Sequence, residues 1–82
     1  MSVEKRKFKR VRKNLPSQVF TLTDQFIVEC VIVDLSEGGA RLTIAVIPEV
    51  VPDYFKLKIG SISPKCRVRW RKGNDVGVEF YE

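Results

Sequence analysis

The chain of 82 residues contains no histidine, only two cysteines and a single tryptophan. Without histidine it lacks the commonest general base and a frequent metal ligand. Cys30 and Cys66 lie far apart in apolar segments and lack the spacing of metal ligands. Ser36 likewise has no histidine to activate it as a nucleophile. We therefore expect a protein that is not an enzyme and that holds neither a metal nor a cofactor.

Long apolar runs are also missing. No segment approaches the roughly 20 apolar residues that a membrane-spanning helix needs, and Met1 leads into a charged stretch rather than into the apolar region of a signal peptide. These absences predict a cytoplasmic protein without stable membrane insertion. In that reducing compartment Cys30 and Cys66 are interpreted as small buried hydrophobes, and a disulfide between neighbouring strands stays open as the alternative.

Positive charge is concentrated at the N-terminus. Residues 1–15 contain seven lysines or arginines and one acid, a net charge of +6, whereas the remaining residues have a net charge of −1. A nucleotide, a nucleic acid or an anionic membrane surface would suit such a segment, and a solvated terminus is the alternative. We interpret residues 1–14 as a flexible basic arm and residues 15–82 as one small domain.

The rest of the chain shows the period-two alternation of strands. Strands are predicted over residues 19–22, 26–35, 40–46, 54–59, 66–71 and 76–80, with Pro48 and Pro52 marking an irregular crossing. The segment 26–35 is apolar on both faces and is expected to be largely buried. The alternation also assigns the aromatic side chains of Phe55, Trp70 and Phe80 to the core. Short strands with frequent turn signals predict an all-β sandwich or barrel.

Two short motifs carry the candidate chemistry. Arg6 and Arg10 are four residues apart in the arm, and Asp34-x-Ser36-x-x-Gly39 forms a turn between two apolar runs. Arginine is a planar fork of donors that fits phosphate oxygens and the O6/N7 edge of guanine. A carboxylate accepts from the N1–H and N2–H₂ groups of guanine. The two motifs therefore suit a guanine nucleotide, although the second also fits a plain turn with capping side chains and a glycine at positive φ.

The order of these motifs resembles the PilZ domain over nearly the whole chain. The resemblance rests on Arg6-x-x-x-Arg10, Asp34-x-Ser36-x-x-Gly39, Val68-Arg69-Trp70-Arg71 and Gly77-Val78-Glu79-Phe80. PilZ domains are bacterial receptors for cyclic di-GMP, built on a six-stranded antiparallel barrel. The resemblance implies that Arg6 and Arg10 grip phosphates and guanine Hoogsteen edges, that Asp34 and Ser36 bind guanine, and that Gly39 keeps the turn open for close approach.

The resemblance also bears on the number of ligands. Cyclic di-GMP binds PilZ domains as one molecule or as an intercalated pair, and an arginine just before the first motif arginine favours the pair. Lys5 occupies this position. It brings the charge that further phosphates need but lacks the flat guanidinium that stacks on guanine. On the balance of charge we expect two ligands per protomer.

The resulting hypothesis is a PilZ protein that binds cyclic di-GMP and relays the signal to an effector protein by ordering of its arm. A PilZ fold used only as a protein–protein adaptor is the first alternative, and the intact motifs argue against it. A small basic β-barrel that binds nucleic acid is the second. Such sites usually present aromatic platforms on an open strand face, whereas the strand aromatics here share the inward period.

Overall fold

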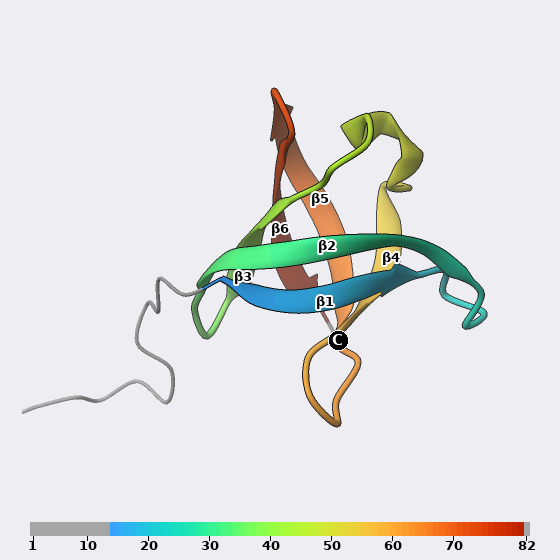
Figure 1. The fold of residues 1–82 in the computed structure, drawn as a ribbon. Coiled ribbons are helices and arrows are strands. Elements are labelled where there is room, and N and C mark those ends of the chain that lie inside the picture. The colour runs from blue at the N-terminus through green and yellow to red at the C-terminus, as the bar shows by residue number, and fades with distance from the viewer. Residues whose placement is uncertain (1–13, 82) are drawn as a thin grey trace, which may run out of the picture.

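The computed structural model describes residues 14–81, which form a closed antiparallel barrel (Figure 1). Its strands are β1 (Leu15–Phe20), β2 (Phe26–Leu35), β3 (Gly39–Thr43), β4 (Tyr54–Lys58), β5 (Lys65–Lys72) and β6 (Asp75–Tyr81). They follow the order β1-β2-β3-β6-β5-β4 around the barrel. The predicted all-β, six-stranded antiparallel barrel is thus confirmed. Within residues 14–81, no helix is long and apolar enough to cross a membrane.

The strand boundaries follow the predicted turns except at β1 and at the end of β3, which stops at Thr43 instead of residue 46. β2 has the predicted bounds, whereas β1 begins at Leu15 instead of residue 19 and includes Pro16. Only the second half of β1, Gln18–Phe20, pairs with β4. A proline is tolerated on an unpaired edge because its missing N–H breaks no ladder bond there. The crossing between β3 and β4 contains one short 3₁₀ helix, η1 (Pro48–Val50).

Eleven hydrophobic side chains with little or no exposure fill the barrel interior. They are Val19, Cys30, Ile32, Leu42, Ile44, Val51, Phe55, Leu57, Cys66, Val76 and Val78. Phe55 is buried as predicted, and Phe80 packs against this core while remaining partly exposed. The alternation in the sequence therefore identified the inward face of most strands, because a side-chain period of two is a fixed property of extended backbone.

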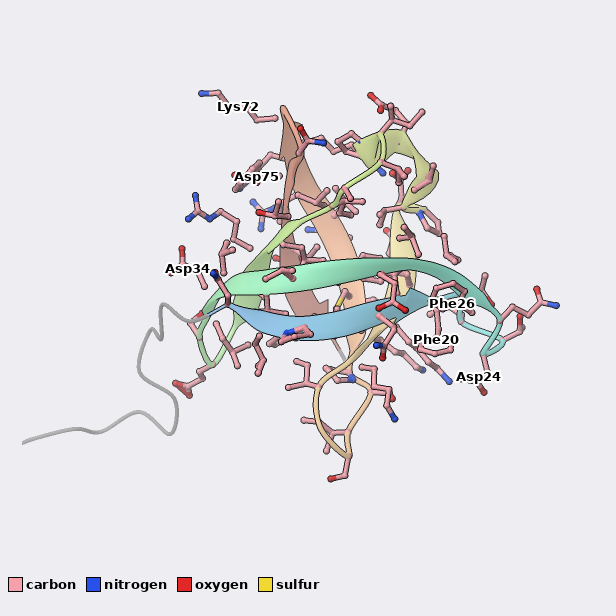
Figure 2. All side chains as sticks on the ribbon, viewed as in Figure 1. Phe20, Asp24, Phe26, Asp34, Lys72 and Asp75 are labelled. Carbon is pink, nitrogen blue, oxygen red and sulfur yellow. The ribbon has the colours of Figure 1, made fainter. Side chains whose placement is uncertain are left out.

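The expectation that β2 is largely buried is wrong. Only Cys30 and Ile32 of this strand are buried, and Phe26 is 55% exposed. A barrel has one interior, so each strand buries one face and leaves the other outside even when both faces are apolar. Phe26 instead packs edge-to-face on Phe20, with ring centroids 5.9 Å apart. Figure 2 shows both phenylalanines at the end of β2 opposite to Asp34.

The β5–β6 hairpin is anchored at its tip. Its turn contains Gly73, whose φ of 61° is a left-handed conformation open to glycine. The next residue, Asn74, donates from Nδ2 to the carbonyl oxygens of Ile44 (2.9 Å) and Val46 (3.3 Å). The Ile44 N–H in turn donates to the Asn74 carbonyl oxygen at 2.9 Å. These bonds hold the tip of the hairpin against the segment between β3 and β4. They thereby fix the positions of β5 and β6.

Both cysteines are free thiols buried in the barrel. Burial raises the pKa of Cys30 to about 11 and that of Cys66 to about 12, from an ordinary value of 9.0. The thiolate, which is the reactive form, is therefore scarce at neutral pH in the folded protein. The sequence interpretation of two buried hydrophobes agrees with this arrangement.

These thiols predict a pH dependence of stability and of reactivity. At pH 8 the native protein should react with a thiol reagent far more slowly than the denatured chain. Stability should be unaffected by the thiols below pH 9 and should fall between pH 9 and about 12, because the unfolded thiols ionise first. Reagent kinetics and denaturant unfolding at several pH values measure both effects. Equal rates in the native and denatured states would contradict the buried placement.

Candidate functional site

An open hollow of about 660 Å³ lies on the barrel surface between the β2–β3 turn and the β5–β6 hairpin. Four strands that are consecutive around the barrel, β2, β3, β6 and β5, carry it. Its lining comprises Asp34, Leu35, Ser36, Gly38, Gly39, Ala40 and Arg41 on one side and Arg69, Trp70, Gly77, Val78 and Glu79 on the other. The hollow therefore joins the predicted Asp-x-Ser-x-x-Gly turn to a second wall from the C-terminal hairpin.

Asp34 is held by an ion pair from the neighbouring strand. Arg41 on β3 places Nη2 3.2 Å from Asp34 Oδ2, and its Nη1 lies 3.8 Å from Asp75 Oδ2 on β6. Asp75 also accepts a 2.8 Å hydrogen bond from the Thr43 hydroxyl. Figure 2 shows Asp34 at one end of β2 and Asp75 on the hairpin above it. Two carboxylates around one guanidinium give this cluster a formal net charge of −1, and only Asp34 and Arg41 of the cluster line the hollow.

The turn after Asp34 is closed by Ser36. The backbone N–H of Ser36 donates to the Gly39 carbonyl oxygen at 2.9 Å, and the Ser36 hydroxyl donates to the same oxygen at 3.3 Å. The hydroxyl therefore bonds a carbonyl oxygen here, whereas the capping interpretation expected it to bond a backbone N–H. A hydroxyl keeps acceptor lone pairs while it donates, so Ser36 can still accept a bond from a molecule in the hollow.

Gly39 has a structural role that the sequence did not reveal. Positive φ occurs at Gly60 and Gly73 but not at Gly39, so Gly39 does not have the role that the plain-turn alternative gives it. A Cβ atom on Gly39 would instead overlap the carbonyl oxygen of Val78 and approach the Cα of Glu79 to 3.1 Å. Gly39 thus permits the close approach of β3 to β6, which bear the two walls of the hollow.

At the opposite wall two arginines share one carboxylate; Arg69 and Glu79 line the hollow, and Arg67 lies outside the lining. Arg69 Nη1 lies 2.6 Å from Glu79 Oε1, and Arg67 Nη2 lies 2.7 Å from Glu79 Oε2. The hydrogen bond from Arg69, with a further contribution from Arg67, lowers the pKa of Glu79, so the carboxylate stays ionised at neutral pH. This cluster has a formal net charge of +1, the opposite sign to the cluster of Asp34, Arg41 and Asp75.

Trp70 belongs to the site and not to the core, contrary to the prediction. It is 45% exposed and lines the hollow. Val68 pairs with Val78, but Trp70 pairs with Gly77, so β5 has one extra residue at this point. Such a bulge reverses the inward–outward alternation of the following side chains.

The signal for this placement was present in Gly77. A Cβ atom there would overlap the Trp70 indole, which therefore lies directly over the glycine. A glycine inside a strand pattern often marks a bulge or the close approach of another part of the chain. The prediction from period-two alternation did not include this signal. The result is an exposed aromatic surface within the hollow.

The structure brings together the predicted site residues that it describes. Asp34, Ser36 and Gly39 all line the hollow. Lys5, Arg6 and Arg10, with nearly all of the predicted arm, lie outside the described residues. Arg41, Trp70 and Glu79 were not predicted as site residues. Arg69 belongs to a stripe of three alternating arginines, Arg67, Arg69 and Arg71, for which the sequence favours a solvent-facing strand face and leaves binding to phosphate or a partner protein as the alternative. The roles of these lining residues depend on which strands are neighbours, and this information is not local in the sequence.

The fold and the hollow define a small β-barrel domain with an open hollow on its surface. The family model of the PilZ domain matches residues 4–82, and the chain belongs to the PilZ domain family. This family consists of binding domains, not catalytic ones, and its members are generally receptors for cyclic di-GMP. No curated protein matches the sequence.

Proposed function

We propose that this protein is a receptor for cyclic di-GMP, which it binds in the hollow between the β2–β3 turn and the β5–β6 hairpin. The observation that carries the proposal is the convergence of Asp34 and Ser36 on a surface hollow whose other wall holds Trp70 and Arg69. The Asp34 carboxylate would accept from the N1–H and N2–H₂ groups of one guanine, with Ser36 beside it. Trp70 would offer its exposed ring for base stacking.

The polarity of the two walls suits this ligand. Guanine presents donors on its N1/N2 edge, which fit Asp34 and the net negative charge of the cluster to which it belongs. The phosphodiester groups are anions and fit Arg69 and the net positive charge of the cluster to which it belongs. The ion pair with Arg41 restrains the Asp34 side chain before the ligand binds. The entropic cost of ordering this side chain on guanine is therefore smaller.

The base of the arm lies at the same end of the barrel. Leu15, the first residue of β1, pairs with Ile32 on β2, two residues before Asp34. Arg10 precedes Leu15 by five residues, a tether of at most about 18 Å. Arg6 and Arg10 could therefore reach a ligand in the hollow and bind its phosphates and guanine Hoogsteen edges. Ordering of the arm over the ligand would then relay the signal to an effector protein.

A titration of the full chain with cyclic di-GMP, in parallel with a single-stranded oligonucleotide, tests the proposal. We expect saturable binding of the dinucleotide, a change in the emission of Trp70, which is the single tryptophan of the chain, and no comparable binding of the oligonucleotide. Calorimetry should count two ligands per protomer if the charge of Lys5 suffices. A count of one ligand per protomer would refute the expected stoichiometry but not the binding of cyclic di-GMP. Lys5→Arg should then raise the number of ligands bound.

The same titration separates the alternatives. An absence of binding to cyclic di-GMP would favour a PilZ adaptor that recognises only proteins. Tighter binding of the oligonucleotide would favour the nucleic-acid-binding alternative. Trp70 is exposed, so the barrel does present an aromatic side chain on which a base could stack.

A further inference from the structure

Arg69 and Arg67 form a matched pair for comparison within the positively charged cluster around Glu79. Both lie on β5, two residues apart, and both form an ion pair with Glu79 at nearly the same distance. They differ in one respect, since Arg69 lines the hollow and Arg67 does not. Arg67 also pairs with Tyr54 across the β4–β5 ladder, and a side-chain hydrogen bond with Tyr54 raises the pKa of its guanidinium.

The ion pair leaves Arg69 able to bind a second anion. Its contact with Glu79 engages Nη1, and a guanidinium carries five N–H donors. The Arg69 side chain is 55% exposed, and exposed ion pairs of this kind hold their partners weakly. Arg67 remains on the other carboxylate oxygen, so Glu79 keeps a counter-charge if Arg69 turns partly toward the hollow.

The other described arginine of the lining is less suited to an anion. Arg41 lies between Asp34 and Asp75, within a group whose formal net charge is −1. Arg69 belongs to a group whose formal net charge is +1. An anionic oxygen entering the hollow would therefore meet a favourable field at Arg69 and an unfavourable one near Arg41.

We propose that Arg69 is a phosphate-binding residue of the barrel itself, acting on a phosphodiester group of the dinucleotide in addition to the arginines of the arm. This inference rests on the proposed function, because it assumes that the hollow holds cyclic di-GMP. It assigns the contact to β5, so part of the phosphate recognition is present before the arm engages.

The test compares Arg69→Ala with Arg67→Ala in calorimetric titrations of the full chain with cyclic di-GMP. Loss of a charged hydrogen bond predicts that Arg69→Ala weakens affinity by about 10-fold or more. Arg67→Ala removes the same charge from the same carboxylate and should change affinity by less than about 3-fold, the scale of an exposed ion pair. Both variants should melt near the wild-type temperature, since each loses one surface ion pair.

Arg69→Lys identifies the group that is bound. A lysine keeps the charge for a phosphate but loses the planar fork, so affinity should recover most of the loss seen in Arg69→Ala. Equal affinities of the two alanine variants would overturn the assignment of Arg69, and a lysine variant as weak as Arg69→Ala would overturn the assignment to phosphate. If the wild-type chain binds no cyclic di-GMP, the proposed function itself fails, a result distinct from either of these.

Discussion

Replacing Arg6 and Arg10 together by alanine is expected to weaken cyclic di-GMP binding by at least about 100-fold. Each arginine would make charge-assisted hydrogen bonds, whose loss costs about 1.5–3 kcal/mol, and every 1.4 kcal/mol is about tenfold in affinity. The double substitution should weaken ligand affinity without lowering the stability of the fold, because the barrel begins at Leu15. Calorimetric titration measures the affinity, and a thermal melt checks that the fold is retained.

The control for this prediction is the double variant Lys7→Ala and Lys9→Ala. It removes the same number of positive charges from the same segment of the arm but leaves both motif arginines in place. If the arm acted only as a diffuse positive charge, the two double variants would bind equally. If the arginine variant bound like wild type, the assignment of the motif would be wrong.

The sequence predicted the fold well because the fold depends on local patterns. Period-two alternation placed Phe55 inside the barrel, and it is fully buried. Glycine and proline marked the ends of strands, so the order of the elements emerged correctly. Closure into a barrel, as against a sandwich, is not local, and the PilZ resemblance supplied it.

The Asp34 turn was likewise predictable from the sequence, whereas the second wall of the hollow was not. Trp70 was assigned to the core because an uninterrupted alternation was assumed, and one extra residue in β5 moved it to the surface. The ion pairs of Arg41 and Glu79 arise because β6 lies between β3 and β5. Partners that are many residues apart become visible only when the register of the strands is known.

Gly39 shows how one residue can serve the fold and the site together. Its carbonyl oxygen accepts both hydrogen bonds from Ser36, and Gly39 pairs with Glu79 across the β3–β6 ladder. The Gly38 carbonyl oxygen accepts from Phe80 N–H at 2.9 Å in the same region. A displacement of the backbone here would therefore move the Asp34 turn and the Arg69 wall relative to one another.

Gly39→Ala should consequently destabilise the protein, while Gly38→Ala should not. The new Cβ at residue 39 would overlap the Val78 carbonyl oxygen, which is backbone and cannot rotate away, whereas a Cβ at residue 38 meets nothing within 4 Å. Overpacking of this kind costs about 1–3 kcal/mol, or about 4–8 °C in melting temperature per kcal/mol for a domain of this size. Gly38→Ala should leave stability unchanged or raise it by up to about 1 kcal/mol, because alanine restricts the unfolded chain.

Thermal melts and titrations of the two variants distinguish a structural from a ligand-contacting role for the motif glycine. If Gly39 is needed mainly for the close approach of β3 and β6, Gly39→Ala lowers the melting temperature. It also weakens ligand affinity, because Ser36 bonds to residue 39 and is displaced with it. If Gly39 matters only as space for the ligand, affinity falls while the melting temperature stays at the wild-type value. The contacts at Val78 and Glu79 favour the first result, and an unchanged melting temperature would show that β3 and β6 do not need the glycine to approach one another.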